Sequence, residues 1–179
     1  MGASSLSIAE HRDAQMDIEV SASRITKASK DTVWEVAEDL ESYPRWGDST
    51  RKTRMVSQRI VSREGNVVVC DVEEVVSGIR SKHRDRFTLY PKDRIEEEII
   101  EGRLGGRFVL TLTETPQGTC IDWNFHVTSK SLTGRVLGLF GGKKLVQGGA
   151  DEYCRQLAEY AEAHPNPGPK SSNQTSIPD

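Results

Sequence analysis

The sequence has few cysteines and no long apolar run, and each shortage excludes a class of protein. Its 179 residues include three cysteines, Cys70, Cys120 and Cys154, which lie far apart and form no CxxC pair. This odd, scattered set predicts reduced thiols rather than a disulfide framework or a zinc site. No run of about 20 apolar residues is present to span a membrane, and the N-terminal stretch has no apolar signal segment. We therefore expect a cytoplasmic protein without stable membrane insertion.

An excess of one charge and the common nucleotide and metal motifs are also missing. The chain carries 24 basic and 27 acidic residues, a formal net charge of −3, and they are mixed along its length. This balance predicts no nucleic-acid partner. The glycine-rich segment GLFGGKK, residues 138–144, lacks the spacing and the Ser or Thr of a phosphate-binding loop. No spacing of His, Cys and carboxylate residues indicates a metal site, and we expect no cofactor.

The length predicts one domain, because chains divide into several cores only at roughly 250–300 residues. Residues 1–16 show little apolar periodicity, and residues 165–179 hold four of the seven prolines beside Ser, Asn and Gln. Such segments bury too little apolar surface to offset chain entropy. We expect flexible tails at 1–16 and 165–179, on either side of a domain at 17–164.

Hydrophobic periodicity predicts the elements of this domain. Alternation over 18–25 indicates a strand, and a helix follows that Ser29 or Asp31 can cap. Pro44 biases Tyr43 away from the helical region, so the helix should stop or turn sharply there. Short turns separate six further strands, which predicts an antiparallel meander: 51–63, 66–77, 80–90, 94–101, 107–115 and 119–128. A wide apolar stripe from about Leu145 onward predicts a long helix, with a break near Gly141.

Alternation along the strands assigns one apolar, inward face. His83 shares that face with Asp85, so an imidazole and a carboxylate are expected to lie together there. The pair could transfer protons to and from a ligand, or it could be a plain polar pair at a strand end. Glu74 and Glu97 interrupt inward apolar rows. A carboxylate inside must be paired or hydrogen-bonded, so either it binds a polar group of a ligand or a β-bulge turns it outward, and we favour the bulge. His126 should face solvent.

The order of elements resembles the START-like superfamily, also called SRPBCC or helix-grip, and within it the polyketide cyclase/dehydrase and coenzyme Q-binding branch. The stretch IEVSASRITKASKDTVWEVAEDLESYPRW, residues 18–46, is similar to the opening of that family, and GTCIDWNFHV, residues 118–127, precedes the closing helix as it does there. The resemblance implies an α+β helix-grip fold. In this fold a curved antiparallel sheet of about seven strands wraps around a long C-terminal helix, with one or two short helices after the first strand.

The resemblance also implies an apolar tunnel between sheet and helix that binds a hydrophobic small molecule, such as a lipid, an isoprenoid or quinone, or a polyketide-like compound. The candidate lining residues are Tyr43, Trp46, Cys70, Val72, Phe87, Leu89, Ile99, Phe108, Leu110, Leu112, Trp123, Phe125, Val136, Leu139, Phe140 and Tyr153. For Tyr43 and Trp46, packing without ligand contact is the alternative. Leu139 and Phe140, beside flexible glycines, are candidates for a gate.

Three functions stay open from the sequence. We favour a binder or carrier without catalysis, because no convincing nucleophile, metal site or nucleotide site is present. The alternative is an enzyme of the polyketide cyclase/dehydratase type, in which His83 and Asp85 move protons in the same cavity. A third is a protein-binding module associated with ribosomes or chaperones. The sequence does not indicate the oligomeric state.

Overall fold

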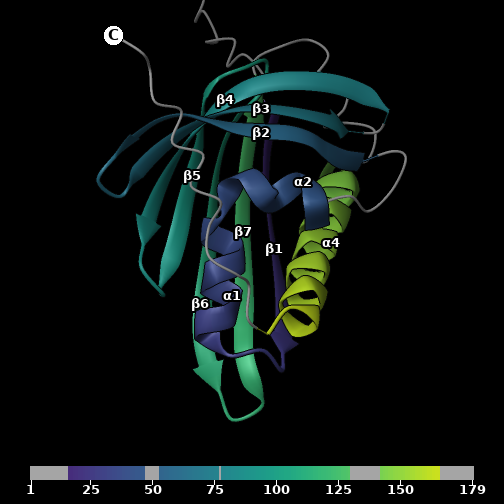
Figure 1. Cartoon of the computed structure of the whole chain (residues 1–179). Helices are drawn as coiled ribbons and strands as arrows, with labels where there is room; N and C mark the ends of the chain where they lie inside the picture. The colour runs from purple at the N-terminus through teal and green to yellow at the C-terminus, as the bar shows by residue number, and fades with distance from the viewer. Residues whose placement is uncertain (1–15, 47–52, 77, 130–141, 166–179) are drawn as a thin grey trace, which may run out of the picture.

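The computed structural model describes residues 16–46, 53–76, 78–129 and 142–165, which form one antiparallel sheet with helices against its concave face (Figure 1). The predicted α+β class and the meander are confirmed, because consecutive strands from β2 to β7 pair with one another. The strands are β1 (Met16–Thr26), β2 (Thr53–Glu64), β3 (Val67–Val76), β4 (Ile79–Tyr90), β5 (Arg94–Glu101), β6 (Gly105–Thr115) and β7 (Gly118–Ser129). The helical segments are α1 (Lys30–Glu38), the short 3₁₀ helix η1 (Leu40–Ser42), α2 (Tyr43–Trp46) and α4 (Gly142–Ala163).

The strand order is β1-β7-β6-β5-β4-β3-β2, so the first described strand pairs with the last. β1 and β7 run antiparallel in an unbroken register from Met16 opposite Ser129 to Thr26 opposite Thr119. β2 forms the other edge, and its pairing with β3 shifts register twice. Such irregularities increase the local twist of a sheet. The curved sheet therefore has a concave face, which the helices cover.

The segment after β1 turns earlier than Pro44 predicts. The Ser29 hydroxyl accepts a hydrogen bond from the Thr32 N–H at 3.2 Å, the expected N-cap. α1 then stops at Asp39, whose backbone leaves the helical region with φ −80° and ψ 73°. The expectation for Tyr43 is wrong, because its φ of −48° and ψ of −42° are helical. Pro44 comes early in α2, where its missing N–H leaves no helical bond unmade.

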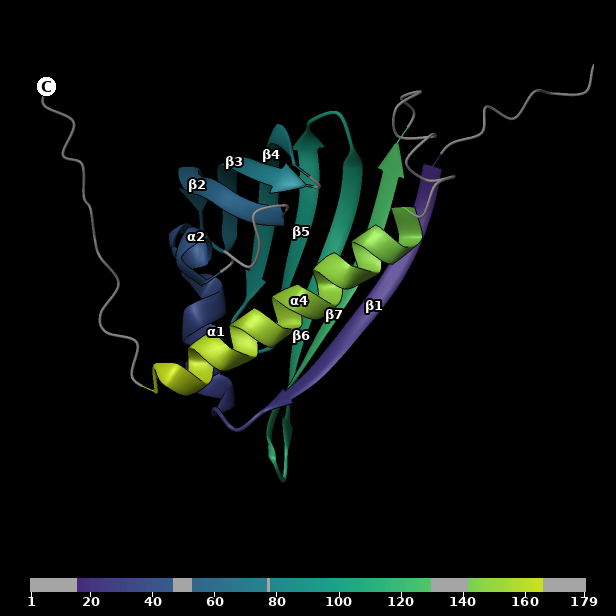
Figure 2. The same ribbon diagram turned by 90° about the vertical axis from the view of Figure 1, so that its right-hand side faces the viewer.

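α4 crosses the concave face on the side of β1 and β7 (Figure 2). It begins at Gly142, three residues before the predicted start, and its buried side includes the small residues Ala150, Ala158 and Ala161. Small side chains let a helix approach a sheet closely. Near its far end the Glu162 carboxylate accepts hydrogen bonds of 2.8 Å from the Thr26 hydroxyl and from the Lys27 N–H. These two bonds tie the end of β1 to α4.

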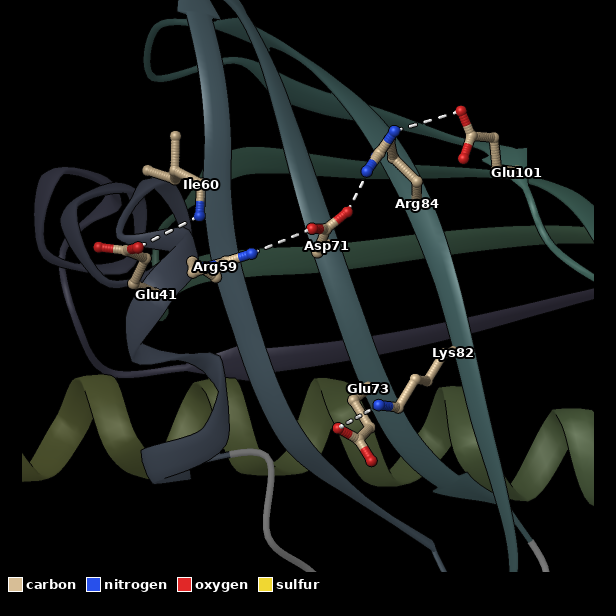
Figure 3. A network of polar contacts seen from close by, with 8 residues as sticks. All are labelled: Glu41, Arg59, Ile60, Asp71, Glu73, Lys82, Arg84 and Glu101. Atoms are coloured by element: carbon tan, nitrogen blue, oxygen red, sulfur yellow. Dashed lines mark hydrogen bonds and ion pairs between the residues drawn. The ribbon is translucent and has the colours of Figure 1, made fainter.

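The convex face carries a network of ion pairs on the side of the strands away from α4 (Figure 3). Arg59 and Arg84 both contact Asp71, at 3.3 and 2.8 Å, and Arg84 also reaches Glu101 at 3.3 Å. At the β2 edge the Ile60 N–H donates to the Glu41 carboxylate at 3.1 Å. This bond occupies part of an edge that could otherwise pair with another chain. Exposed ion pairs of this kind each contribute about 0–1 kcal/mol.

Candidate functional site

The candidate lining residues that the structure describes gather on the concave face and on the helices packed against it. Buried members of this set are Tyr43, Trp46, Cys70, Val72, Phe87, Leu89, Leu110, Leu112 and Trp123. Partly accessible members are Ile99, Phe108, Phe125 and Tyr153. Val136, Leu139 and Phe140, including the proposed gate, lie outside the described residues. The inward face predicted from alternation is therefore the face that the structure buries.

Aromatic rings from three elements meet above this face. Tyr43 of α2 contacts Trp46, Phe87 and Tyr153, with ring centroids 4.7, 6.5 and 5.9 Å away. The Tyr43 hydroxyl donates to the carbonyl of Ala37 at 3.2 Å. Such rings stabilise the folded state through their buried area and through edge-to-face contacts between them.

The polar atoms of Tyr43 and Trp46 form hydrogen bonds inside the protein. The Trp46 Nε1–H donates to the Ser42 hydroxyl at 3.1 Å, and that hydroxyl donates to the Asp39 carbonyl at 2.7 Å. Tyr43 and Trp46 are each only 5% exposed. These contacts favour packing without ligand contact, which is the alternative that the sequence analysis gives for both residues.

His83 and Asp85 of β4 do face inward together. His83 Nε2 lies 3.1 Å from Asp85 Oδ2, and His83 Nδ1 lies 3.9 Å from an oxygen of Glu74 on β3. The His83 side chain is 10% exposed and that of Asp85 is 1% exposed. Asp85 is therefore held by the imidazole and sealed from any ligand, whereas Glu74 keeps 29% of its side-chain surface.

The prediction that bulges turn Glu74 and Glu97 outward is wrong. The β4–β5 register is regular through Glu97, which lies opposite Phe87, and its one shift comes later, between Arg84 and Asp85. On its other side Glu97 lies opposite Phe108 of β6. The β3–β4 register is likewise unbroken at Glu74, and the shift opposite it, between Met55 and Ser57, adds its extra residue to β2 and not to β3. Both glutamates keep the inward direction that alternation gives them.

Glu97 is the functional candidate that sequence reasoning set aside. It lies on the inward face, diagonally across from Asp85 of the neighbouring strand, because Phe87 is opposite Glu97 and Asp85 is opposite Ile99. Burial raises its pKa well above the ordinary value of 4.5, and the charge and hydrogen bond of Asp85 add to this shift. The signal that could have found it is the absence of Gly or Pro between Ile95 and Ile99, where a bulge was expected.

Burial and charge shift the other members of this cluster as well. Burial raises the pKa of Glu74, although the nearby His83 opposes the shift. For His83, burial lowers the pKa, but the hydrogen bond and charge of Asp85, together with Glu74, outweigh it and leave the pKa raised. The inward face thus holds one imidazole, of His83, beside the carboxyl groups of Glu74 and Asp85. Among the described residues, no three such groups are arranged to hold a metal ion.

Two hollows open on the described structure, one away from this cluster and one that His83 helps to line. One, of about 500 Å³, opens at the β1 edge next to Lys143, the second residue of α4. The other, of about 540 Å³, lies over the convex ion pairs around Asp71, Lys82 and Arg84. Both are lined largely by charged or polar side chains, which does not match the apolar site implied by the sequence.

Comparison with known proteins identifies the family. Residues 17–162 match the family described as "Polyketide cyclase / dehydrase and lipid transport". The chain belongs to this family, which confirms the resemblance drawn from its sequence. No curated protein sequence matches the chain. In the described ranges, no helix combines the length and the apolar character that a membrane crossing needs.

Several solved structures share the fold at low sequence identity. TTHA0849 from Thermus thermophilus is 20% identical, with a TM-score of 0.70 over 81% of this chain and 97% of that one. The Zhui aromatase/cyclase from Streptomyces sp. R1128 is 14% identical, with a TM-score of 0.66 over 84% and 96%. A START superfamily protein from Mycobacterium smegmatis is 18% identical, with a TM-score of 0.59 over 83% and 97%. These likenesses concern the fold.

Proposed function

We propose that the protein binds a hydrophobic small molecule, such as a lipid, an isoprenoid or quinone, or a polyketide-like compound, between the concave face and α4. One observation carries the proposal. Ile99, Phe108, Phe125 and Tyr153 point toward the inside of the fold and yet keep accessible surface. Inward apolar side chains that are not fully packed offer a ligand a surface to cover. Membership of a family described by polyketide chemistry and lipid transport supports the same function.

The accessible residues form one continuous end of the face. Phe108 and Phe125 pair across β6 and β7 with their ring centroids 4.8 Å apart, and Glu97 lies opposite Phe108 on β5. Toward the other end, Leu89, Ile95 and others of the same face are buried in the core. The ligand is therefore expected near the strand ends that meet at the turn between β5 and β6, with its polar group within reach of Glu97.

The test is to extract ligand from the purified protein and to identify it by denaturing mass spectrometry. In parallel, Ile99→Trp should weaken binding of a fluorescent apolar probe, because the added ring takes up space on the inner surface. Val61→Trp is the matched control, since Val61 is 49% exposed on β2. Equal probe affinity for wild type and Ile99→Trp, with the fold intact by circular dichroism, would place the ligand elsewhere.

The second candidate function is an enzyme of the cyclase/dehydratase type in the same space. The inward His83 and Asp85, 3.1 Å apart, favour it. Because Asp85 is almost fully buried, it would act on His83 and not on a ligand, so proton transfer would pass through His83 or Glu97. Turnover of an extracted ligand by wild type, lost in His83→Ala, would establish the enzyme. If the ligand binds without turnover, the protein is a binder or carrier and not an enzyme of this type.

We propose that the protein acts in the cytoplasm. Cys70, Cys120 and Cys154 are all free thiols, as a reducing compartment requires. Burial raises the pKa of Cys70 and of Cys154 to about 12, so both remain protonated and unreactive. Fractionation of the source cells, with an antibody to the protein, tests the location.

A further inference from the structure

β1 lies at one edge of the sheet, so one side of its backbone has no partner strand. In an antiparallel ladder the N–H and C=O groups of alternate residues point to the same side of the strand. The C=O of Ser21 accepts a hydrogen bond of 2.7 Å from the Gln147 side chain of α4, which places this carbonyl on the free side, away from β7. The backbone groups of Asp17 and Glu19 alternate in step with Ser21, so they lie on the free side as well.

A hollow of about 500 Å³ lies along this part of the edge. Residues 17–21 of β1 line it, together with Asn124 of β7 and Lys143 of α4. Within the described ranges, no hydrogen bond reaches the backbone of Asp17 or Glu19 from the free side. Unpaired N–H and C=O groups at a sheet edge are a template on which another extended segment can pair.

α4 limits how much of the edge is open. Gln147 already occupies the C=O of Ser21, and beyond the end of β1 the Lys27 N–H donates to Glu162 of α4 at 2.8 Å. Between these two contacts α4 runs beside β1 (Figure 2). A segment that adds to the sheet here therefore pairs with the first half of β1 and not with the second half.

The outer side chains of this first half are acidic. Asp17 and Glu19 alternate with the buried Ile18 and Val20, so both carboxylates point to the convex face. Asp17 contacts His126 at 2.7 Å and still keeps 67% of its side-chain surface. Among the described residues, Glu19 has no ion-pair partner. A lysine or arginine directly opposite either carboxylate on an added strand would stabilise the pairing.

A second copy of the chain does not fit this edge. Antiparallel pairing over residues 17–21 sets Glu19 opposite its own counterpart, and a shift of two residues sets Glu19 opposite the counterpart of Asp17. Like charges directly opposite each other destabilise a strand pair. The occupant that the charges favour is therefore a different, basic segment.

We propose that the free edge of β1 at Asp17 and Glu19 binds an extended, basic segment of a partner protein, which adds to the sheet as a further strand. Its backbone pairs with the N–H and C=O groups of these two residues, and its alternate lysine or arginine side chains lie opposite the two carboxylates. The intervening residues lie beside Ile18 and Val20 at the rim of the core, where apolar side chains fit. This inference goes beyond the proposed function, because it concerns a different site and a protein partner.

The experiment uses the full chain and a fluorescent peptide of alternating lysine and valine, acetyl-Lys-Val-Lys-Val-Lys-amide. Wild type should bind it, and hydrogen exchange at the amides of Asp17 and Glu19 should slow about tenfold or more, which corresponds to one added hydrogen bond at each. The same peptide with N-methylated lysine amides keeps its charge but cannot pair with the edge, and it should bind more weakly. Equal binding of the two peptides, or no binding of either, overturns the proposal.

Two variants separate this edge from general attraction of a basic peptide to an acidic protein. Glu19→Lys should weaken binding about five- to tenfold, because a like charge then lies opposite a lysine of the peptide. Glu114→Lys is the matched control, since Glu114 is exposed on β6, which β7 separates from β1. An equal loss in both variants overturns the proposal. Protection of the Asp17 and Glu19 amides in the free chain also overturns it, because a second copy or another part of the same chain then occupies the edge.

Discussion

Replacing Glu97 by Gln should change how the stability of the protein depends on pH. In the folded protein the pKa of Glu97 is raised well above 4.5, chiefly by burial and then by Asp85. Above pH 4.5 the unfolded chain releases this proton while the folded protein keeps it. Stability contributed by the protonated glutamate therefore falls as the pH rises from 4.5 through the folded pKa. Glutamine has no such proton, so this fall is absent from the variant.

The size of the effect follows from proton linkage. One proton held by the folded state alone changes the free energy of unfolding by about 1.4 kcal/mol per pH unit. His83 also has a raised pKa, so its contribution is complete below 6.5 and is lost as the pH rises through its folded value. That loss has the same sign in both proteins and largely cancels in their difference. As the pH rises, the free energy of unfolding of Glu97→Gln should increase relative to that of wild type by up to about 1.4 kcal/mol per pH unit.

Urea unfolding at half-unit steps from pH 5 to pH 8 measures this difference. The exposed carboxylates with lowered pKa, Asp71 and Glu96, titrate below this range and do not disturb it. Glu98→Gln is the control, because Glu98 is half exposed and pairs with Arg86, and it should run parallel to wild type. If Glu97→Gln also runs parallel, Glu97 is ionised in the folded protein at these pH values and its pKa is not raised.

Three further predictions concern the core, the contact between β1 and α4, and the C-terminal segment. Trp123→Ala should lower the free energy of unfolding by about 3–5 kcal/mol, since this large inward side chain is 7% exposed; an unchanged melting temperature would contradict its inward placement. Glu162→Gln should cost about 1 kcal/mol by weakening the acceptor for the Thr26 hydroxyl and the Lys27 N–H, and no change in the urea midpoint would mean that solvent replaces both bonds. Deleting residues 166–179 should leave stability and probe binding within error, because their composition offers almost nothing to bury; a loss of several degrees would show that they dock on the domain.

Local patterns in the sequence were sufficient to predict the strands and the inward face. Alternation places Phe87, Trp123 and Leu110 correctly, because the period of a strand is a property of the local backbone. The pairing of β1 with β7 has no local signal, since it joins residues far apart in the chain. The structure alone shows it, in an unbroken register from Met16 to Thr26.

The charged part of the site could not be predicted in the same way. An unpaired buried carboxylate is costly, so a glutamate at an inward position predicts either a polar ligand group beside it or a bulge, and the sequence favours the bulge. Burial and the neighbouring Asp85 raise the pKa of Glu97, which favours its neutral form, and the position of Asp85 depends on the register that sets Phe87 opposite Glu97. Register across a hairpin depends on the turn and on the packing of both strands. The sequence of either strand alone therefore does not predict this register.

The pairing of β1 with β7 also sets the order in which the chain can fold. Asp17 and His126, which contact each other across these strands, are 109 residues apart. At roughly 5–20 residues per second of synthesis, β1 leaves the ribosome several seconds before its partner exists. During that time Ile18, Val20 and Ala22 have no sheet to join, although the hairpins from β2 onward can already form. Chains stopped before β7 should therefore aggregate or bind chaperones through β1, and synthesis of β7 and α4 is the step that rescues them.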